Sequence, residues 1–342
     1  MNAAFKMKIC AILVLTTSFS AQAQTPVPKG VAFDAIVKAY VARDVKAVQV
    51  AYPAFEKAYP GNAYTKFFHA YINDRTGTDI EGALREYSEV IRMAPDLSDP
   101  YIYRAMLFSE KGIDDKAIAD VTKAIGLEGD QAPADFFSLR GDYYNSTKAY
   151  TLALADFKTA IAKAPADASY YRGLMNVAFN AGDPGAADPV FKEAMVGAAK
   201  ENGAVKFAYG NYLMRLKKMP EADKVFTEVL ADKQFRPGGE DLNSAAIAAL
   251  NVKDMARAIR LCDEAMKLAP TNADIVVNRA SIAVQQQAWN DVYKFAEIAL
   301  AINSNNPLAN MLMAVGIKRT GKGDALSAEY EAKAKKLEAE GY

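Results

Sequence analysis

The sequence predicts an all-α solenoid of about nine stacked helix pairs, and three observations lead to this prediction. A small residue, a bulky residue four positions later and a small or β-branched residue three after that recur seven times. The first residues of these triplets are spaced 34, 36, 34, 35, 36 and 34 positions apart. No run of the chain alternates apolar and polar residues with the period of two that strands show. The triplets are Ala83/Tyr87/Val90, Ala117/Val121/Ala124, Ala153/Phe157/Ala160, Ala187/Phe191/Ala194, Ala222/Phe226/Val229, Ala258/Cys262/Ala265 and Val292/Ala296/Ala299.

The first 30 residues precede the array and differ from it. Lys6 and Lys8 come before an apolar run at 9–15, which is too short to span a bilayer, and Ala21-Gln22-Ala23 has the small-x-small pattern of a cleavage site. We therefore expect residues 1–23 to be a secretory signal peptide and residues 24–30 to be a short linker. The protein is expected to be exported: to the periplasm of a Gram-negative cell, or out of the cell otherwise.

Residues 31–63 are expected to form a divergent helix pair, and residues 64–303 the seven regular units. The unit at 134–165 shows how each is built: Phe137 and Gly141, and then Ala153 and Phe157 after a polar break, fall at helical spacing. Gly141 and Ala153 allow the two helices to approach closely, and Phe157 fills the space against the neighbouring unit.

Glycines mark the turns between the two helices of a pair, as at Gly112 and Gly182, because glycine accepts a left-handed backbone conformation at a helix end. With these turns and the triplets in register, residues 112–127 and 137–165 resemble the tetratricopeptide repeat family. The resemblance covers residues 64–303 and implies a right-handed αα superhelix. It also implies a concave groove, lined by the first helix of each pair, that binds protein segments.

Residues 304–342 are expected to form a capping helix pair with a wet outer face, as a stacked array requires at its end. Leu326 and Tyr330 carry the periodic contacts of its second helix, but Lys333 stands where a core alanine is expected. The following charged run, 335–340, is polar on most faces.

Composition excludes several classes of function. Without the signal peptide the chain has 39 basic and 41 acidic residues, a net charge of −2, which argues against general nucleic-acid binding and against a polybasic membrane patch. His69 is the single histidine, so no site with two histidine ligands exists. Cys262 is the single cysteine after residue 23 and stands at a core position. We find no catalytic signature, no metal site and no phosphate loop, and we expect no cofactor.

The resemblance also selects candidate groove residues on the first helices of two adjacent central units. Asparagine side chains there can pair with the backbone of an extended peptide, arginines can hold a carboxylate, and phenylalanines can supply apolar anchors. The candidate peptide-binding residues are Arg172, Asn176, Phe179, Asn180, Phe207, Asn211 and Arg215. Arg172 and Asn176 also match the first part of a clamp with which some family members hold a C-terminal carboxylate. The matching later positions, Ala208, Glu240 and Ser244, depart from it, so the resemblance does not extend to that clamp.

These observations predict a non-enzymatic, protein- or peptide-binding scaffold or adaptor of the cell envelope, whose partner is a protein or peptide rather than a nucleic acid or a membrane. Three alternatives stay open. The first alternative is that the groove binds a small ligand or glycan. The second is that the chain is a self-assembling scaffold, and the third is that it is an enzyme with an unrecognised site.

Overall fold

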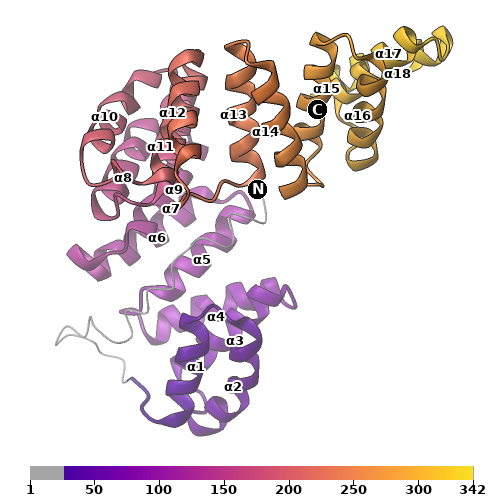
Figure 1. Cartoon of the computed structure of the whole chain (residues 1–342). Helices are drawn as coiled ribbons and strands as arrows, with labels where there is room; N and C mark the ends of the chain where they lie inside the picture. Colours follow the sequence, from indigo (N-terminus) through magenta and orange to yellow (C-terminus); the bar gives the residue numbers. More distant parts are fainter. Residues whose placement is uncertain (1–26, 342) are drawn as a thin grey trace. The chain divides into compact units, whose positions relative to one another are not determined.

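The computed structural model describes residues 27–341, and within this range the chain is built from helices with no strand (Figure 1). Eighteen α-helices form nine consecutive pairs in the described part of the chain. This confirms the all-α prediction and its number of helix pairs. The predicted signal peptide, residues 1–23, lies outside the described residues.

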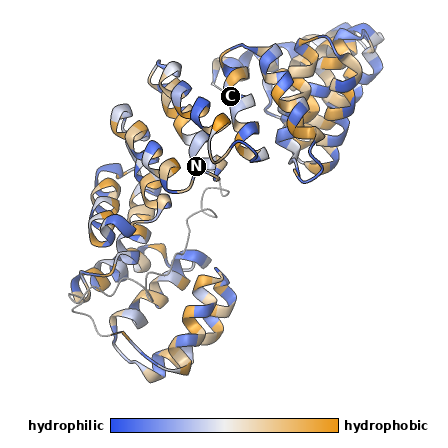
Figure 2. Ribbon diagram, turned by 60° about the vertical axis from the view of Figure 1, so that its left-hand side comes forward, coloured by the Kyte–Doolittle hydropathy of each residue, from blue (hydrophilic) through white to orange (hydrophobic). Residues whose placement is uncertain are grey.

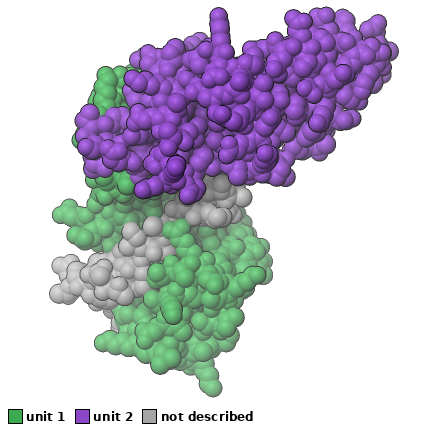
Figure 3. Space-filling view, in the orientation of Figure 1, with its two compact units in different colours: residues 1–193 green, residues 194–342 purple. Residues whose placement is uncertain are grey.

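The chain divides into two compact units, Met1–Glu193 (unit 1) and Ala194–Tyr342 (unit 2), coloured separately in Figure 3. Helix α10 (Asp188–Val196) contains the boundary. Unit 1 holds α1 (Val31–Val41), α2 (Val45–Ala58), α3 (Ala63–Thr76), α4 (Ile80–Met93), α5 (Asp99–Glu110), α6 (Asp114–Glu128), α7 (Ala134–Ser146), α8 (Tyr150–Lys163) and α9 (Ala168–Asn180), with short 3-10 helices at Gly129–Gln131 and Pro184–Ala187. Unit 2 holds α11 (Gly203–Arg215), α12 (Met219–Ala231), α13 (Gly239–Asn251), α14 (Met255–Leu268), α15 (Ala273–Gln285), α16 (Trp289–Ile302), α17 (Pro307–Thr320) and α18 (Asp324–Ala339).

Within each unit the helices pack in two layers. Successive helices contact each other, and odd-numbered helices also contact the next odd-numbered helix, as α7 does with α9, α13 with α15 and α15 with α17. The first helices of the pairs therefore form a layer of their own. Figure 2 shows hydrophobic and hydrophilic residues interleaved on the helices of both units, as expected when each helix buries a stripe rather than its whole surface.

All 21 residues of the seven repeated triplets are buried, none more than 5% exposed. The pattern recognised in the sequence is therefore the core of the array. Cys262, in the bulky position of its triplet, is 1% exposed and has no disulfide partner, which confirms its expected place in the core.

Phe157 shows how one unit locks onto the next. Its ring lies between Gly141 of its own unit and Gly173 at the start of the next. A Cβ atom at Gly173 would lie 2.1 Å from the ring, and one at Gly141 would lie 3.0 Å from it. The sequence predicted both the small residue at Gly141 and the role of Phe157, and the structure adds Gly173 as the second wall.

The turn inside every described helix pair uses one residue in the left-handed conformation, with φ between 55° and 72°. Glycine occupies this position in four pairs, including the predicted Gly112 and Gly182. The other five pairs place a long polar side chain there. The nine residues are Arg43, Gly77, Gly112, Lys148, Gly182, Lys217, Lys253, Gln287 and Gly321. The turn geometry is thus set by the packing of the pair and is kept where glycine is absent.

The last helix, α18, packs on α17 with a register one residue later than predicted. Leu326 is 43% exposed, whereas Ser327 is buried and its hydroxyl donates to the Ala314 carbonyl oxygen at 2.9 Å. Tyr330 does pack partly against the core, as expected. The small buried residues of this helix are Ser327 and Ala334, so the expectation that Leu326 carries a core contact is wrong.

Candidate functional site

The predicted peptide-binding residues fall on two helices, one in each unit. Helix α9 of unit 1 carries Arg172, Asn176, Phe179 and Asn180, and helix α11 of unit 2 carries Phe207, Asn211 and Arg215. Arg172, Asn176, Asn180 and Arg215 are exposed, Phe179 and Asn211 are half-buried, and Phe207 is buried. The candidate residues of α9 therefore belong to unit 1 and those of α11 to unit 2.

Phe207 belongs to the core of unit 2 rather than to an open surface. It is 2% exposed, and its ring lies 4.5 Å from the Phe226 ring and 5.7 Å from the Phe235 ring, centroid to centroid. Phe235 comes from the connection between α12 and α13, which folds back against the start of α11. This contact corrects the expectation that Phe207 is an apolar anchor for a peptide.

On α9 the polar residues form one stripe. Arg172, Asn176 and Asn180 are four residues apart, so they project from the same side of the helix. The Asp167 side chain caps this helix by accepting from the Ser169 backbone N–H at 2.8 Å. The buried residues of α9 include Tyr171, Leu174, Val177 and Ala178. The buried positions of α9 are thus other residues, and the polar stripe is exposed.

The α9 stripe continues onto α7, the preceding odd-numbered helix. The Asn180 Nδ2 atom donates to the Asn145 Oδ1 atom at 3.0 Å. Asp142 lies one turn before Asn145 and is half-buried, and it has no hydrogen bond or ion pair to another described residue. Burial raises the pKa of the Asp142 carboxyl to about 7. We call Asp142, Asn145, Arg172, Asn176 and Asn180 the α7–α9 patch.

The patch combines the groups that an extended peptide needs. An asparagine side chain carries two N–H donors and an acceptor oxygen with which it can pair with a peptide backbone, and an exposed arginine can hold a carboxylate with two parallel bonds. Arg172 has no ion pair to any other described residue. No group of three or more histidine, cysteine or acidic side chains suited to a metal ion occurs in the described part of the chain.

On α11, Asn211 and Arg215 are four residues apart and share one side of the helix. Partial burial lowers the pKa of Arg215. A similar amide pair lies farther along unit 2, where the Asn278 Nδ2 atom of α15 donates to the Asn243 Oδ1 atom of α13 at 3.0 Å. Nothing in the repeat pattern distinguishes the position of Asn278, so the sequence does not predict this pair.

The first helices at the start of unit 1 are packed against one another by aromatic rings. The hydroxyl of Tyr40 on α1 donates to that of Tyr103 on α5 at 3.0 Å, and Tyr71 of α3 lies 5.4 Å from the Tyr103 ring. Arg75 lies over the same ring and pairs with Asp74 at 2.6 Å. This inner surface is occupied by side chains of the protein itself. The sequence shows a run of aromatic residues on successive first helices, but their helical spacing alone predicts ordinary core positions.

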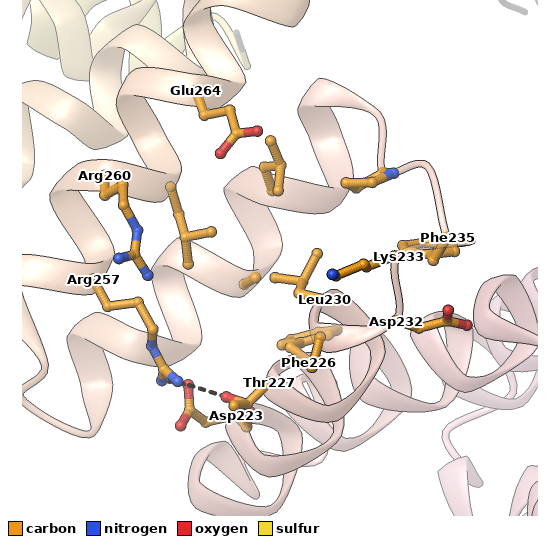
Figure 4. Close-up of a pocket in the computed structure, with 15 residues that line it drawn as sticks. Asp223, Phe226, Thr227, Leu230, Asp232, Lys233, Phe235, Arg257, Arg260 and Glu264 are labelled. Atoms are coloured by element: carbon orange, nitrogen blue, oxygen red, sulfur yellow. Dashed lines mark hydrogen bonds and ion pairs between the residues drawn. The ribbon is translucent and has the colours of Figure 1, made fainter.

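Unit 2 also contains a pocket of about 430 Å³, shown in Figure 4. It is lined by α12, α13, α14 and the connection at residues 232–238. The repeat pattern does not predict this pocket, because the connection at 232–238 lies between two repeated units and is not part of the pattern.

No protein-family model matches the sequence, and no curated protein is significantly similar to it. Solved structures are similar in fold. Yeast Tom70 superposes with a TM-score of 0.63 and 17% identity, over 90% of this chain and 68% of that one. A tetratricopeptide repeat protein from Parabacteroides merdae gives 0.54 and 13%, over 75% and 98%.

A third similar structure is the APC/C hetero-tetramer Cut9–Hcn1, with a TM-score of 0.53 and 17% identity over 82% of this chain. The alignment covers 48% of that longer chain. These superpositions and the stacked helix pairs decide the fold. The chain has the tetratricopeptide-repeat fold. In this tetratricopeptide-repeat solenoid the α7–α9 patch lies on first helices, the layer that the resemblance assigned to the binding groove.

No helix within residues 27–341 is long and apolar enough to cross a membrane.

Proposed function

We propose that this protein is a non-enzymatic scaffold of the bacterial periplasm that binds an extended segment of another protein along the α7–α9 patch. In a cell without an outer membrane, the protein would be secreted. The proposed contacts run between the amides of Asn145, Asn176 and Asn180 and the backbone of the partner, with Arg172 holding a carboxylate of the partner.

The observation that carries this proposal is the exposed stripe on α9. Three exposed donor-bearing side chains share one side of a helix whose buried positions are other residues. Two of the three are amides, and amides at the surface of a first helix are suited to a strand-like backbone rather than to a flat apolar partner. The Cut9–Hcn1 structure supports a protein as the partner, since that similar chain is part of a hetero-tetramer.

The test compares the recovery of envelope proteins by the wild type and by Arg172→Ala and Asn176→Ala variants, with quantitative mass spectrometry. We expect Arg172→Ala to weaken binding by about 1.5–3 kcal/mol, roughly ten-fold or more, as for a lost charge-assisted bond. Arg85→Ala is the matched control, because Arg85 is exposed on α4, a second helix of the same unit. Arg215→Ala tests the α11 surface separately.

Helicity and melting temperature of each variant should equal those of the wild type, because the substituted side chains are exposed. A partner recovered equally well by the wild type and by both α9 variants would place the binding surface elsewhere. A loss of stability in Arg172→Ala would instead give Arg172 a packing role and remove the basis of the proposal.

The export of the protein is tested by cell fractionation. The full chain should be recovered in the periplasmic fraction and shortened by about its first 23 residues, the expected signal peptide, whereas a variant that starts at Gln24 should stay in the cytoplasm. Equal distribution of both forms would contradict the proposed location.

A further inference from the structure

The pocket of unit 2 has an apolar floor. Phe226 and Leu230 of α12, Leu242 of α13 and Leu261 of α14 line it. Its volume of about 430 Å³ lies within the range of small-molecule sites, which are mostly apolar with a few placed polar groups. The floor can therefore bury the apolar body of a small molecule.

The wall on the loop side is fixed in place. Phe235 stacks on Phe207, with the two ring planes 16° apart. The same ring lies so close to the start of α11 that a Cβ atom at Gly203 would be 2.7 Å from it. The connection at 232–238 is thus anchored by an aromatic contact, so that the pocket is already formed without a ligand.

Two cations at the pocket edges are unpaired within the described residues. Figure 4 shows Lys233 directed from the loop toward Leu230, and Arg260 reaching in from α14. Neither forms an ion pair with a described residue, whereas the neighbouring Arg257 is paired with Asp223. Lys233 and Arg260 thus leave positive charge available on either side of the apolar floor.

The carboxylates of the lining do not cancel this charge. Asp223 is neutralised by Arg257. Asp232 keeps its charge, with its Oδ1 atom accepting from the Gln234 backbone N–H at 2.8 Å, but Figure 4 shows its carboxylate directed away from Leu230. Glu264 lies one turn beyond Arg260 on α14 without an ion pair to it (Figure 4). An anion over the floor therefore meets two cations without an ion pair to a described residue, whereas the two carboxylates that also lack one, Asp232 and Glu264, lie at the edge.

From this arrangement we infer that the pocket is a binding site for a small amphipathic carboxylate. The apolar body lies on Phe226, Leu230, Leu242 and Leu261, and the carboxylate pairs with Arg260 and is attracted by Lys233. The site lies among α12, α13, α14 and a loop of unit 2, so it is separate from the α7–α9 patch and does not depend on the proposed function.

The experiment is calorimetric titration of the full mature chain with naphthalene-2-carboxylate, and with its neutral amide as the matched ligand. One ligand should bind per chain, and the amide should bind at least about ten-fold more weakly because it lacks the charge that Arg260 and Lys233 attract. Arg260→Ala and Lys233→Ala should each weaken binding by about three- to ten-fold, and added salt should weaken it further. Lys224→Ala, an exposed α12 variant outside the pocket, should bind as the wild type does.

A Leu230→Trp variant fills the floor and should abolish binding. Its melting temperature and helicity show whether it folds. If the Leu230→Trp variant does not fold, Arg260→Ala and Lys233→Ala still test the site. Absence of saturable binding to the wild type would overturn the assignment, as would equal affinity for the carboxylate and the amide. A third arm uses a peptide ending in a leucine carboxylate. If the peptide binds in an Arg260-dependent way and the naphthalene carboxylate does not, the site takes a protein chain end, which also contradicts the inference.

Discussion

Replacing Gly173 by alanine tests the packing of one unit on the next. The new Cβ atom would lie 2.1 Å from Cε1, 2.4 Å from Cζ and 2.8 Å from Cδ1 of Phe157. Carbon atoms in contact are about 3.5 Å apart, so the ring would have to move by about 1.4 Å (3.5 minus 2.1). Gly141 blocks the other side of the ring, since even there a Cβ atom would be only 3.0 Å away.

The expected loss of stability follows from two opposing effects. Overpacking of a closed core costs about 3 kcal/mol at the upper end, and alanine gains about 1 kcal/mol over glycine in a helix. The net destabilisation is therefore about 2 kcal/mol. Gly126→Ala is the matched control: Gly126 lies inside α6 with no atom within 4 Å of the added Cβ, so that variant should be more stable by about 0.5–1 kcal/mol.

The assay is urea and thermal unfolding followed by far-ultraviolet circular dichroism for the wild type and both variants. A Phe157→Leu substitution made in the Gly173→Ala background should recover part of the loss, because it removes the clashing ring atoms. If Gly173→Ala is as stable as Gly126→Ala, the helices do not approach as closely as described, and the reasoning is refuted.

Three further predictions concern single residues. Lys148→Gly should stabilise the protein by up to about 1 kcal/mol, measured by urea unfolding, because Lys148 has a φ of 62° that glycine adopts without strain; a loss of stability would contradict this. Cys262 should react slowly with a thiol reagent in the native protein and fast in denaturant, since burial raises its thiol pKa to about 11; prompt native labelling would show that the position is open. Asp142→Asn should raise stability at neutral pH and leave it unchanged near pH 3, where the carboxyl is protonated in both the folded and the unfolded chain. The folded-state pKa of about 7 lies above the ordinary value of 3.8, so wild-type stability should fall as pH rises from about 4 to 7 and the variant should lack this slope in pH-dependent unfolding.

The core was predictable from the sequence because each unit repeats the same contacts. Ala153 and Phe157 recur in equivalent form seven times, and every member of these triplets is buried. The number of helix pairs and the core position of Cys262 follow from the same register.

The surface was less predictable because it depends on segments that differ from one unit to the next. Phe207 occupies a first-helix position that can face solvent, but Phe235 from a seven-residue connection, 232–238, covers it. The pocket beside that loop depends on the same insertion. In α18 many residues are charged, so the spacing of apolar residues does not define which side of the helix is buried. The small residue Ser327, rather than Leu326, faces the core. The polar stripe on α9 was predictable, since its spacing follows directly from the helix period.

Binding of a protein segment by the α7–α9 patch is tested most directly by photo-crosslinking in cells. A photoreactive amino acid replaces Asn176 on α9 in one strain and Lys158, which is exposed on the second helix α8 of the same region, in another. We expect a discrete crosslinked partner from position 176, lost when Arg172→Ala is added, and none from position 158. Equal crosslinking from both positions, or from position 158 alone, would contradict it.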